Sequence, residues 1–187
     1  MKKLVLLLCL MAVMTWGDAF AQLPAVTLKT IDGQTVKIDT LNNGGKPFII
    51  DFFATWCKPC QRELDAIAEV YADWQEETGV KLIAVSIDQA QNVQKVKPLV
   101  SNHGWEYEVL LDTNEELKRA FGVQMIPFTM IVDGNGQVVY KHTGYTDGVE
   151  EELINNDLSI IEKGVTSALP EFDNLMYAVV RKRCNLL

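Results

Sequence analysis

The sequence predicts a single α/β domain in which helices cover both faces of a central mixed β-sheet. Apolar runs of strand length alternate with segments of helical periodicity. A strong hairpin signal, Asp133-Gly-Asn-Gly136, follows this alternation. The length of 187 residues favours one domain over two full-sized ones. With 48% apolar and 22% charged residues, the composition excludes a disordered or collagen-like chain.

The first half of the chain is expected to form a hairpin, a buried strand, a long helix and a second buried strand. Alternating side chains around the turn signal Asp32-Gly33 predict the hairpin. The next run is continuously apolar apart from Asp51, as in a strand buried on both faces. Apolar residues then recur at helical spacing from Leu64 to Tyr71, and Gly79 ends the helix. The expected ranges are 25–29 and 34–38 for the hairpin, 48–53 and 80–87 for the buried strands, and 57–77 for the helix.

The second half is expected to repeat this alternation and to close with a hairpin and a helix. Pro98 should kink or shorten the first helix of this half. Thr113 and Glu116 form a capping box that opens a short helix, and Asp147 and Glu150 form another. The expected ranges are 91–102, 113–121 and about 147–163 for the helices, and 107–111, 128–132 and 137–141 for the strands.

The first 21 residues have the pattern of a secretory signal peptide. Lys2 and Lys3 are followed by an apolar run at 4–14, and Ala19 and Ala21 supply the small side chains of a cleavage site. As a helix the apolar run would span only about 17 Å, which argues against the alternative of a membrane anchor in a core of about 30 Å. We therefore expect export to the periplasm or cell envelope as a soluble protein. The expected organisation is a signal peptide at 1–21, a mature domain at 22–163 and a tail at 164–187 whose structure the sequence does not define.

Charge and rare residue types exclude several function classes. The formal net charge of −8 argues against a nucleic-acid-binding surface, which needs a basic footprint. Two histidines leave little scope for a histidine-rich metal site or a Ser-His-Asp hydrolase. Most of the functional information therefore lies in the four cysteines, at positions 9, 57, 60 and 184.

Cys57 and Cys60 stand at the junction of a predicted buried strand and a predicted helix. Their spacing allows a disulfide within one helical turn, and the positive end of the helix dipole should stabilise a thiolate at Cys57. Cys60 is then placed to resolve a mixed disulfide by attacking Cys57. Pro59 is compatible with a first helical turn. Lys58 either favours the charged sulfur or is a solvated lysine without a role.

Three other roles for the cysteine pair are weaker. A zinc site would need two further ligands, but only Cys184, His103 and His142 remain, at no recognisable spacing. Haem attachment would require histidine where the chain has Gln61. A purely structural disulfide across so short a loop would contribute little stability. The pair is therefore predicted to be redox-active, and we expect no cofactor or metal ion.

The stretch from Phe48 to Cys60, ending in Trp-Cys-Lys-Pro-Cys, resembles the active-site region of the thioredoxin superfamily. Met125–Thr129 resembles the cis-proline segment of that superfamily, and Val132–Val138 its closing hairpin. The export signal and the segment 91–111 are most similar to the TlpA/ResA/DsbE-like branch of extracytoplasmic thiol-disulfide oxidoreductases. The resemblance covers about 23–163 and implies a thioredoxin fold with a helix-strand insertion.

The resemblance also implies roles for individual residues. Pro127 would form a cis peptide bond and lie beside Cys57, and the backbone of Ile126 would pair with the client chain. Trp56 is similar to the exposed, client-facing tryptophan of the family. Asp51 matches the buried acid of thioredoxin, whose pKa burial should raise so that it accepts the proton of Cys60. The alternative for Asp51 is a strand-edge carboxylate that reaches water.

The sequence departs from the family pattern at two points. The lysine that accompanies the buried acid of thioredoxin has no clear counterpart, because Ala84 falls near that position and Lys81 is displaced from it. Asp65 stands where many relatives have a helix-kinking proline, which predicts a straighter helix. The first departure puts the proton pathway in doubt.

The function implied by this resemblance is the reduction of protein disulfides within an oxidising compartment. A membrane-bound electron donor would keep the protein reduced, and its clients would include apocytochrome c or damaged secreted proteins. Three alternatives stay open: a disulfide-forming oxidase, a thiol peroxidase and a non-catalytic binding module. Cys184 is either inert or pairs between chains to give a disulfide-linked dimer.

Overall fold

The computed structural model describes residues 22–146 and 148–168. The predicted signal peptide, Asp147 of the last predicted capping box, and Cys184 lie outside the described residues. A single sheet of seven strands organises the described part, in the order β2-β1-β5-β4-β3-β6-β7. Its strands are β1 (Thr27–Thr30), β2 (Thr35–Lys37), β3 (Phe48–Phe53), β4 (Lys81–Ser86), β5 (Glu108–Leu111), β6 (Phe128–Val132) and β7 (Val138–Thr143).

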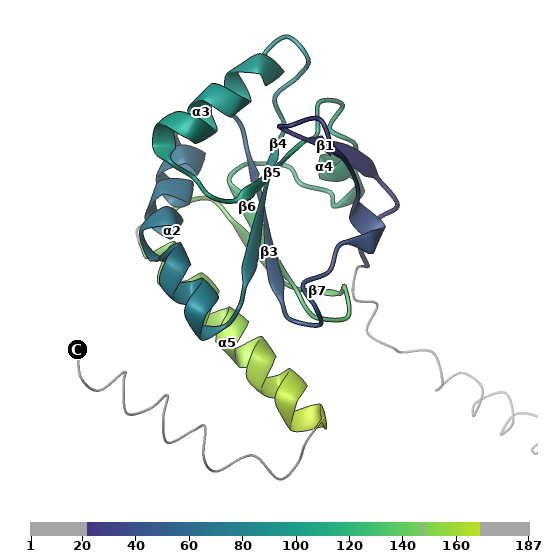
Figure 1. Cartoon of the computed structure of the whole chain (residues 1–187), viewed down its shortest axis with the longest axis vertical. Helices are drawn as coiled ribbons and strands as arrows, with labels where there is room; N and C mark the ends of the chain where they lie inside the picture. Colours follow the sequence, from purple (N-terminus) through teal and green to yellow (C-terminus); the bar gives the residue numbers. More distant parts are fainter. Residues whose placement is uncertain (1–21, 147, 169–187) are drawn as a thin grey trace, which may run out of the picture.

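The sheet is mixed, as predicted. β4 pairs in parallel with β3 and with β5, whereas the other pairs, β1–β2, β1–β5, β3–β6 and β6–β7, are antiparallel. Figure 1 shows α2, α3 and α5 on one side of the sheet and α4 on the other. The helices are α2 (Lys58–Glu77), α3 (Val96–His103), α4 (Glu116–Ala120) and α5 (Val149–Ala168), with 3-10 turns η1 (Ile38–Thr40) and η2 (Val93–Lys95). The predicted α/β class with helices on both faces is confirmed.

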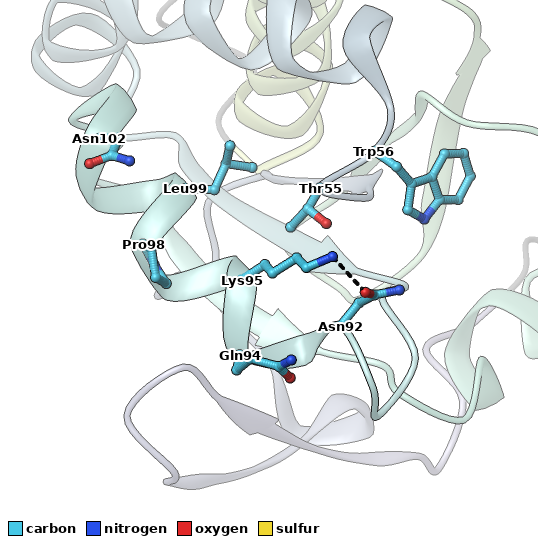
Figure 2. Close-up of a pocket in the computed structure, with 8 residues that line it drawn as sticks. All are labelled: Thr55, Trp56, Asn92, Gln94, Lys95, Pro98, Leu99 and Asn102. Atoms are coloured by element: carbon cyan, nitrogen blue, oxygen red, sulfur yellow. Dashed lines mark hydrogen bonds between the residues drawn. The ribbon is translucent and has the colours of Figure 1, made fainter.

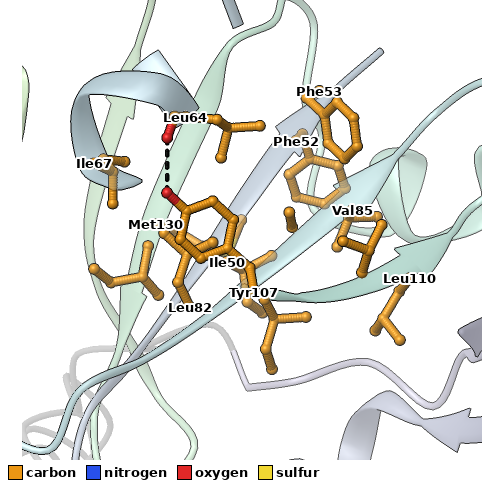
Figure 3. Close-up of a cluster of buried hydrophobic side chains, with 14 of the residues drawn as sticks. Ile50, Phe52, Phe53, Leu64, Ile67, Leu82, Val85, Tyr107, Leu110 and Met130 are labelled. Atoms are coloured by element: carbon orange, nitrogen blue, oxygen red, sulfur yellow. Dashed lines mark hydrogen bonds between the residues drawn. The ribbon is translucent and has the colours of Figure 1, made fainter. Parts of the chain in front are cut away.

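The core centres on β3, in which all six side chains are buried. Its register places Phe48 to Phe53 against β4 and Phe48 to Phe52 against β6. Figure 3 shows this cluster, in which the hydroxyl of Tyr107 donates to the carbonyl oxygen of Leu64 in α2 at 2.7 Å. The buried tyrosine therefore satisfies its polar group while its ring fills the space between helix and sheet.

Two helix boundaries differ from the sequence prediction. Pro98 lies in the first turn of α3, which begins at Val96 after the separate 3-10 turn η2, so the helix starts later than predicted. This placement is tolerated because a first-turn residue needs no intrahelical N–H bond. The last helix was predicted to end near residue 163, and α5 instead continues to Ala168.

The predicted capping box at the start of α4 is wrong. The residue before the helix is Glu115, in a left-handed conformation with φ 54° and without a side-chain cap. Asp112 replaces the capping box, because its carboxylate accepts the backbone N–H groups of Leu117 at 3.3 Å and Lys118 at 2.8 Å. The cap therefore comes from the residue that follows β5, and it links this strand to the helix.

Removal of this cap should destabilise the domain. We expect Asp112→Ala to lower the free energy of unfolding by about 1–2 kcal/mol, because two N–H groups lose a buried acceptor. Thr113→Ala, at the position of the predicted cap, is the matched control and should change stability by less than about 0.5 kcal/mol. Urea unfolding of both variants measures this difference. An equal effect of the two substitutions would contradict the assignment.

Candidate active site

Cys57 and Cys60 form a disulfide at the N-terminus of α2. Cys57 is the N-cap residue, and its sulfur accepts the backbone N–H of Cys60 at 3.3 Å. The predicted first-turn position of Pro59 is confirmed. Cys57 is 5% exposed and Cys60 is 0% exposed, so Cys57 is the less buried of the two cysteines. A thiolate at Cys57 would meet unpaired N–H groups and the positive end of the α2 dipole.

A set of side-chain contacts fixes the loop between β3 and α2. The buried carboxylate of Asp88 accepts the backbone N–H and the hydroxyl of Thr55, both at 2.7 Å, and the hydroxyl of Ser86 at 2.9 Å. From the other side, the Gln61 amide donates to the carbonyl oxygen of Thr55 at 2.8 Å. Lys58 in turn donates to the side-chain oxygen of Gln61 at 3.0 Å. Thr55 is therefore held on both sides, two residues before Cys57.

The peptide bond between Ile126 and Pro127 is cis, as the family resemblance implied. Phe52 pairs with Phe128, so Pro127 lies level with the end of β3. There the chain enters the cysteine loop, residues 54–57 between β3 and α2. Pro127 is buried and Ile126 is half-buried. The register thus brings the predicted client-binding segment, at the start of β6, to the end of the sheet where β3 leads into the cysteine loop.

Two large apolar side chains are exposed at the segments that carry these features. Trp56, directly before Cys57, is 64% exposed, and Met125, directly before Ile126, is 66% exposed. The prediction of an exposed tryptophan is confirmed. No role for Met125 was predicted from the sequence, because a single methionine in a loop gives no periodic signal. Both side chains therefore present apolar surface to solvent beside predicted site residues.

Asp51 is fully buried, and it shares a hydroxyl with a second buried carboxyl group. The hydroxyl of Thr129, opposite Asp51 in β6, lies 2.8 Å from Asp51 Oδ2 and 2.6 Å from Glu63 Oε1. Because a hydroxyl has one proton, it can donate to only one carboxyl group and must accept from the other. The geometry is therefore satisfied when one of the two carboxyl groups is protonated. The alternative of a solvent-exposed Asp51 is wrong.

The environment raises the pKa of both acids. Burial raises the pKa of Asp51 to about 7. Burial, together with repulsion by the charge of Asp51, raises the pKa of Glu63 to about 9. At neutral pH the pair therefore holds at least one proton and can take up or release another near pH 7.

Glu63 was not predicted from the sequence as a site residue. This residue lies one helical turn after Cys60, on the buried face of α2 that also carries Leu64 and Ile67. The signal was available, because a glutamate three residues from the buried cysteine falls on the same face of the helix. It was overlooked because the neighbours on this face, Leu64 and Ile67, form the apolar stripe of a core-facing helix.

The absence of a thioredoxin-type lysine near Asp51 agrees with the register, in which Ala84 lies directly opposite Asp51. Lys81 pairs with Phe48 at the far end of the strand and forms an ion pair with Glu108. Asp65, at the position of the family proline, accepts the indole N–H of Trp105 at 2.8 Å, and α2 is a continuous helix.

Among residues 22–146 and 148–168, no cluster of three or more potential ligand side chains could hold a metal ion. Within the same described part, no helix is long and apolar enough to cross a membrane.

The buried acids predict a pH-dependent stability with a defined sign. The folded state keeps protons that the unfolded chain, with ordinary pKa values of 3.8 and 4.5, has released at neutral pH. The contribution of the pair to the free energy of unfolding is therefore greatest below about pH 4 and falls as pH rises through about 7 and about 9. The double variant Asp51→Asn, Glu63→Gln should lose less stability over this range, as measured by urea unfolding at several pH values.

Glu76→Gln, which changes an exposed acid of the same helix, is the control and should leave the pH profile of the wild type unchanged. A double variant with the same pH dependence as the wild type would show that the pair does not titrate as described.

Comparison with known proteins adds three findings. The sequence matches the AhpC/TSA family over residues 20–141. It is 28% identical over 144 residues to the thiol-disulfide oxidoreductase ResA of Bacillus subtilis, covering 77% of this chain and 76% of ResA. The solution structure of a thioredoxin-like protein from Porphyromonas gingivalis is 63% identical, with a TM-score of 0.69 over 79% of this chain and 96% of that chain.

A crystal structure of a DsbE-type thiol:disulfide interchange protein from Chlorobium tepidum is 24% identical, with a TM-score of 0.66 over 76% of this chain and 97% of that chain. This likeness shows the fold. The predicted thioredoxin fold is confirmed.

Proposed function

Since the chain belongs to the AhpC/TSA family and is a thiol-disulfide oxidoreductase of the ResA/DsbE type, we propose that it reduces disulfides of exported client proteins. The observation that carries this proposal is the N-cap position of Cys57, a residue that keeps an exposed fraction of 5% while Cys60 is fully buried. This arrangement assigns the attack on the client to Cys57 and the resolving step to Cys60.

In the first step, the thiolate of Cys57 attacks one sulfur of the client disulfide. A mixed disulfide between Cys57 and the client forms, and the second client sulfur leaves as a thiolate that takes up a proton. The helix dipole and the N–H of Cys60 stabilise the attacking thiolate. Trp56 contacts the client in this step, and the backbone of Ile126 beside Pro127 pairs with the client chain.

In the second step, the thiolate of Cys60 attacks the sulfur of Cys57. The bond between Cys57 and the client breaks, and the client leaves with two thiols while the enzyme keeps the disulfide. Cys60 must lose a proton in a fully buried position. We assign this proton to the pair of Asp51 and Glu63, because the pair titrates near neutral pH and Glu63 lies one turn from Cys60.

We place this reaction outside the cytoplasm. The N-terminal 21 residues support export, and a compartment that forms disulfides needs a protein to reduce them again. A membrane-bound donor supplies the electrons, and apocytochrome c, whose cysteines must be reduced before haem attachment, is one client class. N-terminal sequencing of the protein purified from cells tests cleavage before Gln22.

Single cysteine variants separate the two steps. Cys57→Ser should abolish the reduction of a protein disulfide, because no accessible nucleophile remains. Cys60→Ser should accumulate a mixed disulfide with the client, because the resolving thiolate is missing. Non-reducing electrophoresis after mixing with a disulfide-containing substrate detects both results. Full activity of Cys57→Ser would refute the mechanism.

The reduction potential of the cysteine pair decides the direction of electron flow. We expect a value near that of thioredoxin, about −270 mV, at which the enzyme disulfide is stable and the dithiol donates electrons. Equilibration in defined thiol buffers measures it. A value near about −120 mV would overturn the reductase proposal in favour of disulfide formation. Rapid consumption of peroxide by the reduced protein would instead support the thiol peroxidase alternative.

A further inference from the structure

A groove of about 470 Å³ lies between the cysteine loop and the segment that contains η2 and α3. Figure 2 shows Thr55 and Trp56 on one side of it and Pro98 and Leu99 of α3 on the other. Trp56 directly precedes Cys57, so one wall of the groove belongs to the segment that carries the nucleophile. Its volume lies in the range of pockets that bind specific ligands.

The charge of the groove is opposite to that of the whole chain. The sequence has 25 acidic and 17 basic residues, yet no carboxylate lines the groove, and Lys95 is the single charged residue in its lining. The ammonium group of Lys95 donates to the side-chain oxygen of Asn92 at 2.9 Å, an interaction that holds it across the groove (Figure 2). Asp88, which bonds to Thr55 of the lining, is buried, and its carboxylate oxygens are occupied by hydrogen bonds from Thr55 and Ser86.

The rest of the lining suits a polypeptide. Asn92, Gln94 and Asn102 present side-chain amides, which donate and accept hydrogen bonds as a peptide backbone does. Trp56 offers an exposed aromatic ring, and Leu99 adds apolar surface on the opposite wall. Amides beside apolar walls match an extended segment with alternating backbone and side-chain contacts.

We propose that this groove binds the client segment that flanks its reactive cysteine, and that it selects an acidic side chain through Lys95. The proposal rests on the proposed reduction of client disulfides. A client must bring its sulfur to Cys57, so the chain on one side of that sulfur passes Trp56 and enters the groove. There Lys95 attracts a carboxylate, whereas the net negative charge of the whole protein repels it.

The test uses the reduced full chain and synthetic peptides that each contain one disulfide. The peptides differ only in carrying Glu, Gln or Lys at successive positions on either side of the cysteine. At the preferred position, the second-order rate constant of reduction should be up to about fivefold higher for Glu than for Lys, as for an exposed ion pair, and the ratio should decrease in high salt. The overall charge alone would give the reverse order.

Variants at one position assign the preference. Lys95→Glu should reverse it, and Lys95→Met, which keeps most of the aliphatic chain, should abolish it. Lys37→Glu, an identical charge change in the edge strand β2, is the control and should keep the preference for Glu. Equal rates for all peptides, or a preference for Glu that survives in both Lys95 variants, would overturn the inference alone. Failure to reduce any peptide would instead overturn the proposed function.

Discussion

Complete burial of β3 is the constraint on which the site depends. Both of its neighbours bond along the strand, and helices lie on both sides of the sheet. Asp51 fixes the register, because only in this register does its carboxyl group meet Thr129 and Glu63. A slip by one residue would turn this carboxyl group to the other face of the sheet, without these partners. The register therefore fixes where β3 ends and where the cysteine loop begins.

The pair of Asp51 and Glu63 shows how a core can hold two acids without a lysine opposite Asp51. One shared hydroxyl and one retained proton replace the ion pair that a lysine would form, and the register places Ala84 where such a lysine could have stood. Burial of both acids disfavours their ionised forms, so both pKa values rise. Because the pKa of Asp51 lies near neutral pH, its carboxyl group can take up a proton there, which connects the stability of the core to the proposed chemistry.

The sequence was sufficient for the features that rest on local patterns. The continuous apolar run of β3, the hairpin signals and the spacing of Cys57 and Cys60 each depend on neighbouring residues, and all were predicted. The features that escaped depend on contacts between distant segments. Asp112 caps α4 only because β5 ends beside that helix, and Glu63 meets Asp51 only because α2 packs on β3. Likewise, the clamp of Asp88 on Thr55 joins residues 33 positions apart. A periodic pattern along the chain cannot predict contacts between such distant residues.

The two walls of the groove come from separate parts of the chain. Thr55 and Trp56 belong to the loop whose geometry Asp88 and Gln61 fix for the cysteines, whereas the opposite wall belongs to η2 and α3. The second wall supplies none of the hydrogen bonds that hold Thr55 of the cysteine loop and Gln61 of α2. Related proteins could therefore diverge in the clients that they serve by exchanging a few side chains between residues 92 and 102, while the electron-transfer chemistry stays the same. With client recognition on the segment of η2 and α3 and the redox chemistry on the cysteine loop, the two properties would evolve separately.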